Sequence, residues 1–243
     1  MGALSRAVVA VGLVAAISSE TIRRWLKAAA LKPHQVRSWM NSHDPRFREK
    51  IAQIVALYLH PPQDSVVVSV DERTQMQAIE RFEPDRPMQP GRPARRESSY
   101  RRHGTCVLFA ALVVHTGQVL GQVRERRSSR EFCEFLLWLI PQLPSGQTVH
   151  LILDNLSIHT TPAVRALEEM LQGRLVLHFT PTHASWVNQV ELFFSVLHRR
   201  LLARGDFKNV ADLAAQVLQF IADYNRHHAH PYRWTYEGVP LAP

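Results

Sequence analysis

The stretch Val66-Val67-Val68-Ser69-Val70-Asp71 joins a short apolar, β-branched run to an acidic residue. A continuous run of this length predicts a buried strand. The same pattern returns in Val149-His150-Leu151-Ile152-Leu153-Asp154. The two stretches therefore predict two buried strands, each with an aspartate directly after its last residue.

The sequence around these strands alternates between strand and helix signals. Residues 105–114 and 118–124 flank the turn residues His115-Thr116-Gly117 and predict a hairpin. A further buried strand is predicted over residues 175–179, and helices over residues 128–139, 161–171, 187–203 and 210–226. The resulting order is β-β-β-α-β-α-β-α-α. It predicts an α/β fold with a mixed sheet, three antiparallel strands and then two parallel ones, with helices on both faces. This is the order of the ribonuclease-H-like fold.

An all-helical region precedes this pattern. Apolar residues recur at helical spacing from Leu4 to Ala15, and Ser18 or Ser19 offers the N-cap of a second helix. That helix has an apolar face formed by Ile22, Trp25, Leu26 and Ala29, and a basic face that includes Arg23, Arg24 and Lys27. A helix, a short turn and a basic helix predict a partial helix-turn-helix region that binds DNA. A signal peptide is the alternative interpretation of the first 19 residues.

Two further helices are expected before the first strand. A short one is predicted over residues 34–40, and a longer one is predicted to begin at Asp44, the N-cap, with Pro45 at its first position. Pro61-Pro62 ends the helical region. We therefore expect two domains, a helix-turn-helix region over residues 1–62 and an α/β domain over residues 63–243.

Composition and charge limit the class of protein. The 243 residues are 46% hydrophobic and 21% charged, which excludes a disordered tail and a fibre. Two cysteines are too few for a disulfide framework and favour the cytoplasm. The longest apolar run has 11 residues, short of the ~18 that a membrane span needs. The net charge of +8 and the pI of about 10.1 indicate a polyanionic partner, most plausibly DNA.

The positive charge is concentrated in residues 81–130, which include most of the segment between the first two predicted strands. Residues 81–130 contain eleven arginines and four acidic residues. A loop is predicted over residues 73–104, beside the sheet edge that carries the aspartates. Its arginines are expected to contact DNA phosphates, namely Arg92, Arg95, Arg96, Arg101 and Arg102. The alternative is a solvated loop whose arginines have no particular role.

Three carboxylates are predicted to meet at one edge of the sheet. Asp71 and Asp154 follow neighbouring parallel strands, and open α/β sheets place their sites at the carboxyl edge. Glu191 lies among apolar residues of the helix after the last strand, where an unpaired charge is costly. Two like charges about 4 Å apart repel by roughly 4 kcal/mol at an effective dielectric constant near 20. Two Mg²⁺ or Mn²⁺ ions would offset this repulsion and support an in-line phosphoryl displacement.

Five segments carry a family resemblance: Val70-Asp71-Glu72, residues 100–105, Leu153-Asp154-Asn155 with His159, residues 178–191, and residues 230–235. At these segments the sequence resembles the transposases of the IS630 family, within the Tc1/mariner group of DDE enzymes. The resemblance implies that Asp71, Asp154 and Glu191 form the catalytic metal-binding triad. It also implies cleavage of transposon ends and transfer of their 3′-hydroxyls into target DNA, with Mg²⁺ as the cofactor.

The resemblance implies partners and further roles as well. The expected partners are terminal inverted repeats, target DNA and a second copy of the chain, on the nucleoid of a bacterial cell. In this hypothesis Asp71 bridges two ions, while Asp154 and Glu191 each hold one. Three neighbouring residues are expected to orient these ligands or to contact phosphate, namely Asn155, His183 and Asn188; the alternative is that they only shape turns and loops.

The N-terminal region departs from the family pattern. Family members carry two helix-turn-helix units, and this sequence matches only the second, so we expect an N-terminally shortened chain. Two alternatives to a transposase therefore stay open. One is a nuclease of the same fold that cleaves DNA without strand transfer. The other is a truncated DNA-binding product without activity that acts as a regulator.

Overall fold

The computed structural model of the chain describes residues 2–33, 44–171 and 173–235. The chain divides into two compact units, residues 1–41 and residues 42–243. In the first unit lie helices α1 (Gly2–Ala10) and α2 (Ser19–Ala28). Ser18 is the N-cap of α2, because its hydroxyl accepts the backbone N–H of Thr21 at 3.0 Å. The short helix predicted over residues 34–40 lies outside the described residues.

The predicted apolar face of α2 is mostly exposed. Among the described residues of the first unit only Ile22 is buried, and 57% of the surface of Trp25 is exposed. The predicted basic residues Arg23, Arg24 and Lys27 are also exposed. This pair of helices therefore buries little of its own apolar surface.

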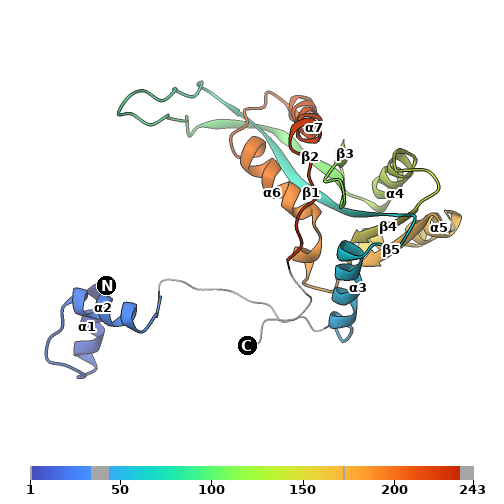
Figure 1. Ribbon diagram of the computed structural model, residues 1–243. Helices are drawn as coiled ribbons and strands as arrows, with labels where there is room; N and C mark the ends of the chain where they lie inside the picture. The colour runs from blue at the N-terminus through green and yellow to red at the C-terminus, as the bar shows by residue number, and fades with distance from the viewer. Residues whose placement is uncertain (1, 34–43, 172, 236–243) are drawn as a thin grey trace. The chain divides into compact units, whose positions relative to one another are not determined.

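The second unit is built on a five-stranded sheet in the order β3-β2-β1-β4-β5 (Figure 1). The antiparallel part joins β1 (Ser65–Arg81), β2 (Tyr100–Val113) and β3 (Val119–Arg124). On the other side of β1, β4 (Thr148–Leu153) and β5 (Leu175–Phe179) run parallel to it. The predicted α/β fold, with a mixed ribonuclease-H-like sheet, is confirmed.

Helices cover both faces of this sheet. On one face α4 (Ser129–Leu139), the short 3₁₀ turn Ile140–Gln142 and α5 (Pro162–Met170) cover a core that includes Val66, Val68 and Val70. On the other face α6 (Val190–Leu197) and α7 (Val210–His227) pack on residues of β1 and β2, among them Met76 and Leu108. A π-helical segment, His198–Leu202, continues α6.

Helix α3 (Phe47–Leu59) belongs to the second unit, which corrects the predicted boundary after Pro62. Its buried residues, such as Ile51 and Ile54, share a core with Val67 of β1 and Ile152 of β4. The apolar face of α3 needs the sheet to cover it, so the division between the units falls before this helix. The helix also starts later than predicted, because the Asp44 carboxylate accepts the backbone N–H of Arg46 ahead of the first turn.

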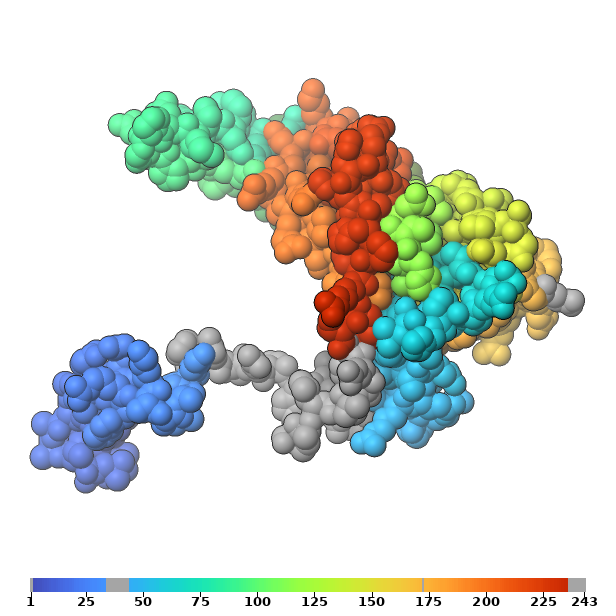
Figure 2. Space-filling view, in the orientation of Figure 1, coloured from blue at the N-terminus to red at the C-terminus, as the bar shows by residue number. Residues whose placement is uncertain are grey.

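The first strand is much longer than the predicted run of residues 66–70. It continues through Asp71 to Arg81, which pairs with Tyr100 at the start of β2. A register shift lies between Arg73 and Met76, where Gln75 has a φ of 53°, as expected for a bulge in a long strand. The predicted loop over residues 73–104 is therefore reduced to residues 82–99. We call residues 82–99 the arm; Figure 2 shows it projecting from the body of the second unit.

The segment after α7 contacts elements that are distant in the sequence. The backbone of His230 lies so close to the turn residue Gly117 that a Cβ there would come within 2.0 Å of its carbonyl oxygen, and the φ of Gly117 is +72°. Further along, the ring of Trp234 contacts that of Tyr58 in α3, with centroids 5.0 Å apart. None of the described helices has the length and apolar character needed to cross a membrane.

Candidate active site

The site forms where β1 leaves one neighbour and continues with the other. Pairing of β1 with β4 ends at Ser69, opposite Ile152, while pairing with β2 continues at Asp71, opposite Ala110. Asp154 comes directly after the last residue of β4. The two aspartates therefore lie at the carboxyl edge of the parallel pair, as the sequence predicted.

Asp71 and Glu72 serve opposite faces of the sheet. Successive side chains of a strand point to opposite faces. Val70 packs in the core under α4 and α5, so Glu72 shares that face and Asp71 faces the side of α3 and α6. Both acidic residues are buried, with 8% of the surface exposed in each.

The segment before α6 fixes the position of Glu191. The hydroxyl of Tyr58 donates to the carbonyl of Val187, at 2.8 Å, at the end of the 3₁₀ turn Ser185–Val187. The side-chain amide of Asn188 donates to the carbonyl of Val70, also at 2.8 Å. These two bonds hold the entrance of α6 against β1, and Glu191 follows in the first turn of that helix.

Three carboxylates act on one another at this edge. Burial, with the negative charges of Asp154, Glu72 and Glu191 adding to it, raises the pKa of Asp71 to about 7. Burial also raises the pKa of Glu191, against the lowering effect of the Arg73 charge and with a raising contribution from Asp154. The structure therefore brings the predicted trio within electrostatic reach of one another.

Asp154 differs from the other two carboxylates. Burial pushes its pKa up, but hydrogen bonds from His159 and from the backbone N–H of Leu156 outweigh burial. The positive charge of Arg127 acts in the same direction, so the net result is a lowered pKa. Asp154 therefore stays ionised beside Asp71, whose carboxyl binds a proton near neutral pH.

His159 is the buried partner of Asp154. It ends the 3₁₀ turn Ser157–His159, and its side chain is 0% exposed. Its Nδ1 lies 2.9 Å from Asp154 Oδ1, and its Nε2 lies 2.8 Å from Glu72 Oε1. Burial lowers the pKa of His159, but the bonds to the two carboxylates overcome this and raise it to about 9. His159 is therefore positively charged at neutral pH. Glu72 and His159 stand inside the motifs that carry the family resemblance, but no role was predicted for either residue.

The donor chemistry of the site fits a hard divalent cation. The carboxylates supply oxygen ligands, and the raised pKa of Asp71 indicates negative charge that lacks full compensation. Within the described part of the chain, however, no three His, Cys, Asp or Glu side chains are gathered closely enough to form a ready ion site. The residues thus match the ion in chemistry without forming a closed set of ligands.

The three residues expected to support the triad have different positions. The side-chain amides of Asn155 and Asn188 donate to backbone carbonyls, that of Thr180 after β5 and that of Val70 in β1. Both therefore connect the segments that carry the carboxylates. His183 is exposed on the loop before α6, and its φ of 63° is left-handed.

Two positive groups beside the carboxylates were not predicted. A groove next to Glu191 is lined by Arg73, Phe194, Ser195, His198 and Arg199. Arg73 lies close enough to Glu191 to lower its pKa, and Arg127 does the same to Asp154. A basic residue two positions after the first aspartate was the available signal for Arg73. The position of Arg127 depends on the tertiary fold.

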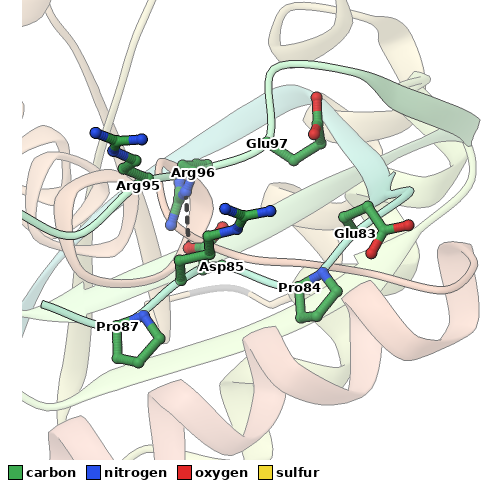
Figure 3. A pocket seen from close by; sticks show the side chains of 8 residues that line it. Glu83, Pro84, Asp85, Pro87, Arg95, Arg96 and Glu97 are labelled. Atoms are coloured by element: carbon green, nitrogen blue, oxygen red, sulfur yellow. Dashed lines mark hydrogen bonds and ion pairs between the residues drawn. The ribbon is translucent and has the colours of Figure 1, made fainter.

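The arm arginines are engaged unequally. Arg96 donates to the carbonyls of Ala203 and Arg204, at 2.9 and 3.0 Å, and its Nε lies 3.0 Å from the Asp85 carboxylate. Figure 3 shows Arg96 turned toward Asp85 in the pocket at the base of the arm. Arg92 and Arg95 are exposed. Arg96 thus has protein partners at the base of the arm, and its predicted contact with DNA phosphate stays a prediction.

The remaining predicted basic residues are exposed. In β2, the guanidinium of Arg101 lies over the Phe82 ring and that of Arg102 over the Tyr100 ring, 5.6 and 5.4 Å from the ring centroids. In α2, Arg23 pairs with Glu20 one turn earlier. These contacts orient the side chains and leave them accessible.

Comparison with known proteins agrees with this geometry. A family model described as "DDE superfamily endonuclease" matches residues 66–214. The "Insertion element IS630 uncharacterized 39 kDa protein" of Shigella sonnei is 25% identical over 213 residues, which are 84% of this chain and 59% of that protein. The chain therefore spans a little under three fifths of this relative.

Solved structures of the Mos1 mariner transposase share the fold. The paired end complex with Mn matches with a TM-score of 0.59 at 17% identity, over 85% of this chain and 64% of that chain. The strand transfer complex gives the same TM-score and identity over 85% and 63%. The isolated catalytic domain matches with a TM-score of 0.53 at 15% identity, over 77% of this chain and 85% of that chain.

Proposed function

The chain belongs to the DDE superfamily endonucleases, and from this premise we propose that it is a DNA transposase. In this proposal it cuts transposon ends and joins their 3′-hydroxyls to target DNA, using Mg²⁺ or Mn²⁺. The observation that carries the proposal is the coupling of Asp71, Asp154 and Glu191, whose negative charges act on one another at one edge of the sheet.

The three carboxylates would divide the work of holding two divalent ions. Asp71 would contribute from the central strand, Asp154 from the end of β4, and Glu191 from α6. When bound, such ions activate the attacking oxygen and stabilise the leaving oxygen of an in-line phosphoryl displacement. The carboxyl of Asp71, with its pKa of about 7, would have to lose its proton to serve as a ligand of a divalent cation.

The basic residues beside the carboxylates support a path for DNA. Arg73 and Arg199 line the groove next to Glu191, and the positive charge of Arg127 acts on Asp154. Guanidinium groups bind phosphate with two parallel hydrogen bonds. We infer that these arginines contact the phosphates that flank the scissile bond, while the arm and helix α2 contact other parts of the DNA.

Cleavage of a labelled duplex that carries the inverted repeats bordering the reading frame tests this function. With Mg²⁺, the proposal expects nicks at the repeat ends and products joined to a supercoiled plasmid target. Nicks without joined products would identify a nuclease of the same fold. Repeat binding that is equally tight with and without metal, with no cleavage under either condition, would identify a regulator instead.

The partners follow from the same reaction. Cutting and joining two transposon ends requires two active sites, so we propose that a homodimer binds both ends together. Terminal repeats and target DNA are the nucleic-acid partners, and the bacterial relative supports a place on the nucleoid in the cytoplasm. Light scattering with and without repeat DNA measures whether two chains assemble on two ends.

A further inference from the structure

A buried histidine stands between two carboxylates, and the proposed chemistry does not use it directly. His159 Nε2 lies 2.8 Å from Glu72 Oε1, and His159 Nδ1 lies 2.9 Å from Asp154 Oδ1. An ionised carboxylate can only accept hydrogen bonds, so the ring donates from both nitrogens. A ring that donates from both nitrogens carries a positive charge, here placed between two negative ones.

The surroundings of His159 leave it no route to a substrate. Its side chain is 0% exposed and that of Glu72 is 1% exposed. The ring of Phe132 in α4 packs against the imidazole, with centroids 4.3 Å apart. Within the described residues, Glu72 Oε2 has no hydrogen-bond partner, so the bond to His159 is what holds this carboxylate. Because neither side chain can reach a substrate, the pair can affect the reaction only through the groups that it contacts.

The pair contacts Asp154 through His159. The backbone N–H of Leu156 donates to Asp154 Oδ1 at 3.0 Å, and His159 Nδ1 lies 2.9 Å from the same oxygen and 3.2 Å from the backbone carbonyl oxygen of Asp154. Neither donor uses Oδ2. A carboxylate that is held at one oxygen by two donors presents its other oxygen in a fixed direction.

We propose that Glu72 and His159 form a positioning pair that fixes Asp154 for the reaction from the opposite face of the sheet. The inference rests on the proposed function, since it assigns Asp154 to the metal-dependent chemistry. Asp71 and Glu72 are consecutive in β1, so one strand supplies a carboxylate to the reaction on one face and the anchor of a second carboxylate on the other. His159 and Glu72 are positioning residues and touch no substrate.

The test compares His159→Gln and Glu72→Gln with the wild-type chain. Calorimetric titration of the DNA-free protein with Mn²⁺ measures ion affinity, and single-turnover nicking of the repeat duplex at saturating DNA measures the chemical step. Loss of an outer partner of a metal-binding carboxylate typically costs about 10–100-fold in affinity or activity. We expect a loss of that size in both measurements, with unchanged DNA affinity in the absence of metal. His150→Gln is the matched control, because His150 is a partly buried strand histidine paired with His178 away from the site.

The outcomes separate the positioning pair from the proposed function. A folded His159→Gln or Glu72→Gln protein with wild-type Mn²⁺ affinity and nicking rate would overturn the pair. If His159→Gln does not fold, Glu72→Gln carries the test, since it keeps the size and one acceptor of Glu72. A wild-type chain that binds Mn²⁺ but never cleaves would refute the proposed function, while the Mn²⁺ titrations would still support or overturn the pair.

Discussion

The carboxylate edge of the sheet and the arm are both rich in charged residues, but these residues are buried or half-buried at the edge and largely exposed in the arm. At the edge, Asp71 and Glu72 are buried; Glu72 has one fixed partner, His159, while the charge of Asp71 lacks full compensation. In the arm, the side chains of residues 82–99 are almost all exposed, and the Arg96 guanidinium donates hydrogen bonds to two backbone carbonyls of the chain. Local charge density alone therefore does not identify a candidate catalytic surface. Burial of the charge and the number of its partners are better guides.

The largest effect is expected when a carboxylate at the edge of the sheet is removed. Asp71→Asn, Asp154→Asn and Glu191→Gln are each expected to lower the nicking rate by roughly 10³-fold or more, because each removes charge that acts only at the reacting centre. Glu169→Gln, on an exposed position of α5, is the matched control and should nick at the wild-type rate. A triad variant that keeps a tenth of the wild-type rate would contradict the assignment.

The second prediction concerns stability without metal. The pKa of Asp71 is about 7 in the folded chain and near 3.8 when unfolded, so the folded state binds the extra proton between these values. Stability should therefore fall as the pH rises from about 4 to 7. Asp71→Asn removes this penalty, and at pH 8 it should raise the free energy of unfolding by a few kcal/mol, on the order of 1.4 kcal/mol per pKa unit.

Thermal unfolding at several pH values, with a chelator present, measures this effect. The pKa of His159, raised to about 9, adds stability that is complete below about 6.5 and is lost as the pH rises through 9, in both proteins. Asp85→Asn in the arm is the control, because the Asp85 side chain is 46% exposed. Equal stability of Asp71→Asn and wild type at pH 8 would argue against a buried charge at this position.

A third prediction separates the arginines of the two regions. Arg73→Ala should lower the nicking rate at saturating DNA by about tenfold and reduce the salt slope of binding by about one unit. Arg92→Ala should reduce the salt slope by a similar amount and leave the nicking rate unchanged. Binding isotherms at four salt concentrations, with nicking measured in parallel, test both. An effect of Arg92→Ala on the nicking rate would erase the distinction between the edge and the arm.

The smallest effect is expected from Arg96→Ala. This change removes two hydrogen bonds to the carbonyls of Ala203 and Arg204, a loss of about 1–2 kcal/mol at a partly exposed site. The arm should become more sensitive to limited proteolysis, while the salt slope of DNA binding stays at the wild-type value. A salt slope of DNA binding reduced by one unit would show instead that Arg96 contacts a DNA phosphate.

The sequence predicted strands β4 and β5 well and the length of β1 poorly. The strand over residues 175–179 was predicted at its observed bounds, because a short apolar run between a glycine and a proline has few alternatives. After Asp71 the polar residues of β1 carry no such signal, since pairing with β2 and a bulge near Gln75 hold them in the strand. The long β1 is a product of tertiary pairing.

The candidate site was predictable in its carboxylates and not in their partners. Asp71 and Asp154 follow apolar runs that are visible in the sequence, and Glu191 stands out as a charge among apolar residues. The bond between Glu72 and His159 joins residues 87 positions apart, and no local pattern predicts it. The same holds for Arg127, whose influence on Asp154 exists only after the sheet and α4 have formed.

The packing of α3 on the sheet has a practical consequence for anyone who wishes to isolate the catalytic unit as a fragment. A fragment that started at the double proline would lack the phenol of Tyr58, and with it the bond that pins Val187 ahead of α6. Glu191 would then lose its alignment although every acidic residue of the site was still encoded. A useful fragment has to begin upstream of Asp44, so that the whole of α3 travels with the sheet it covers.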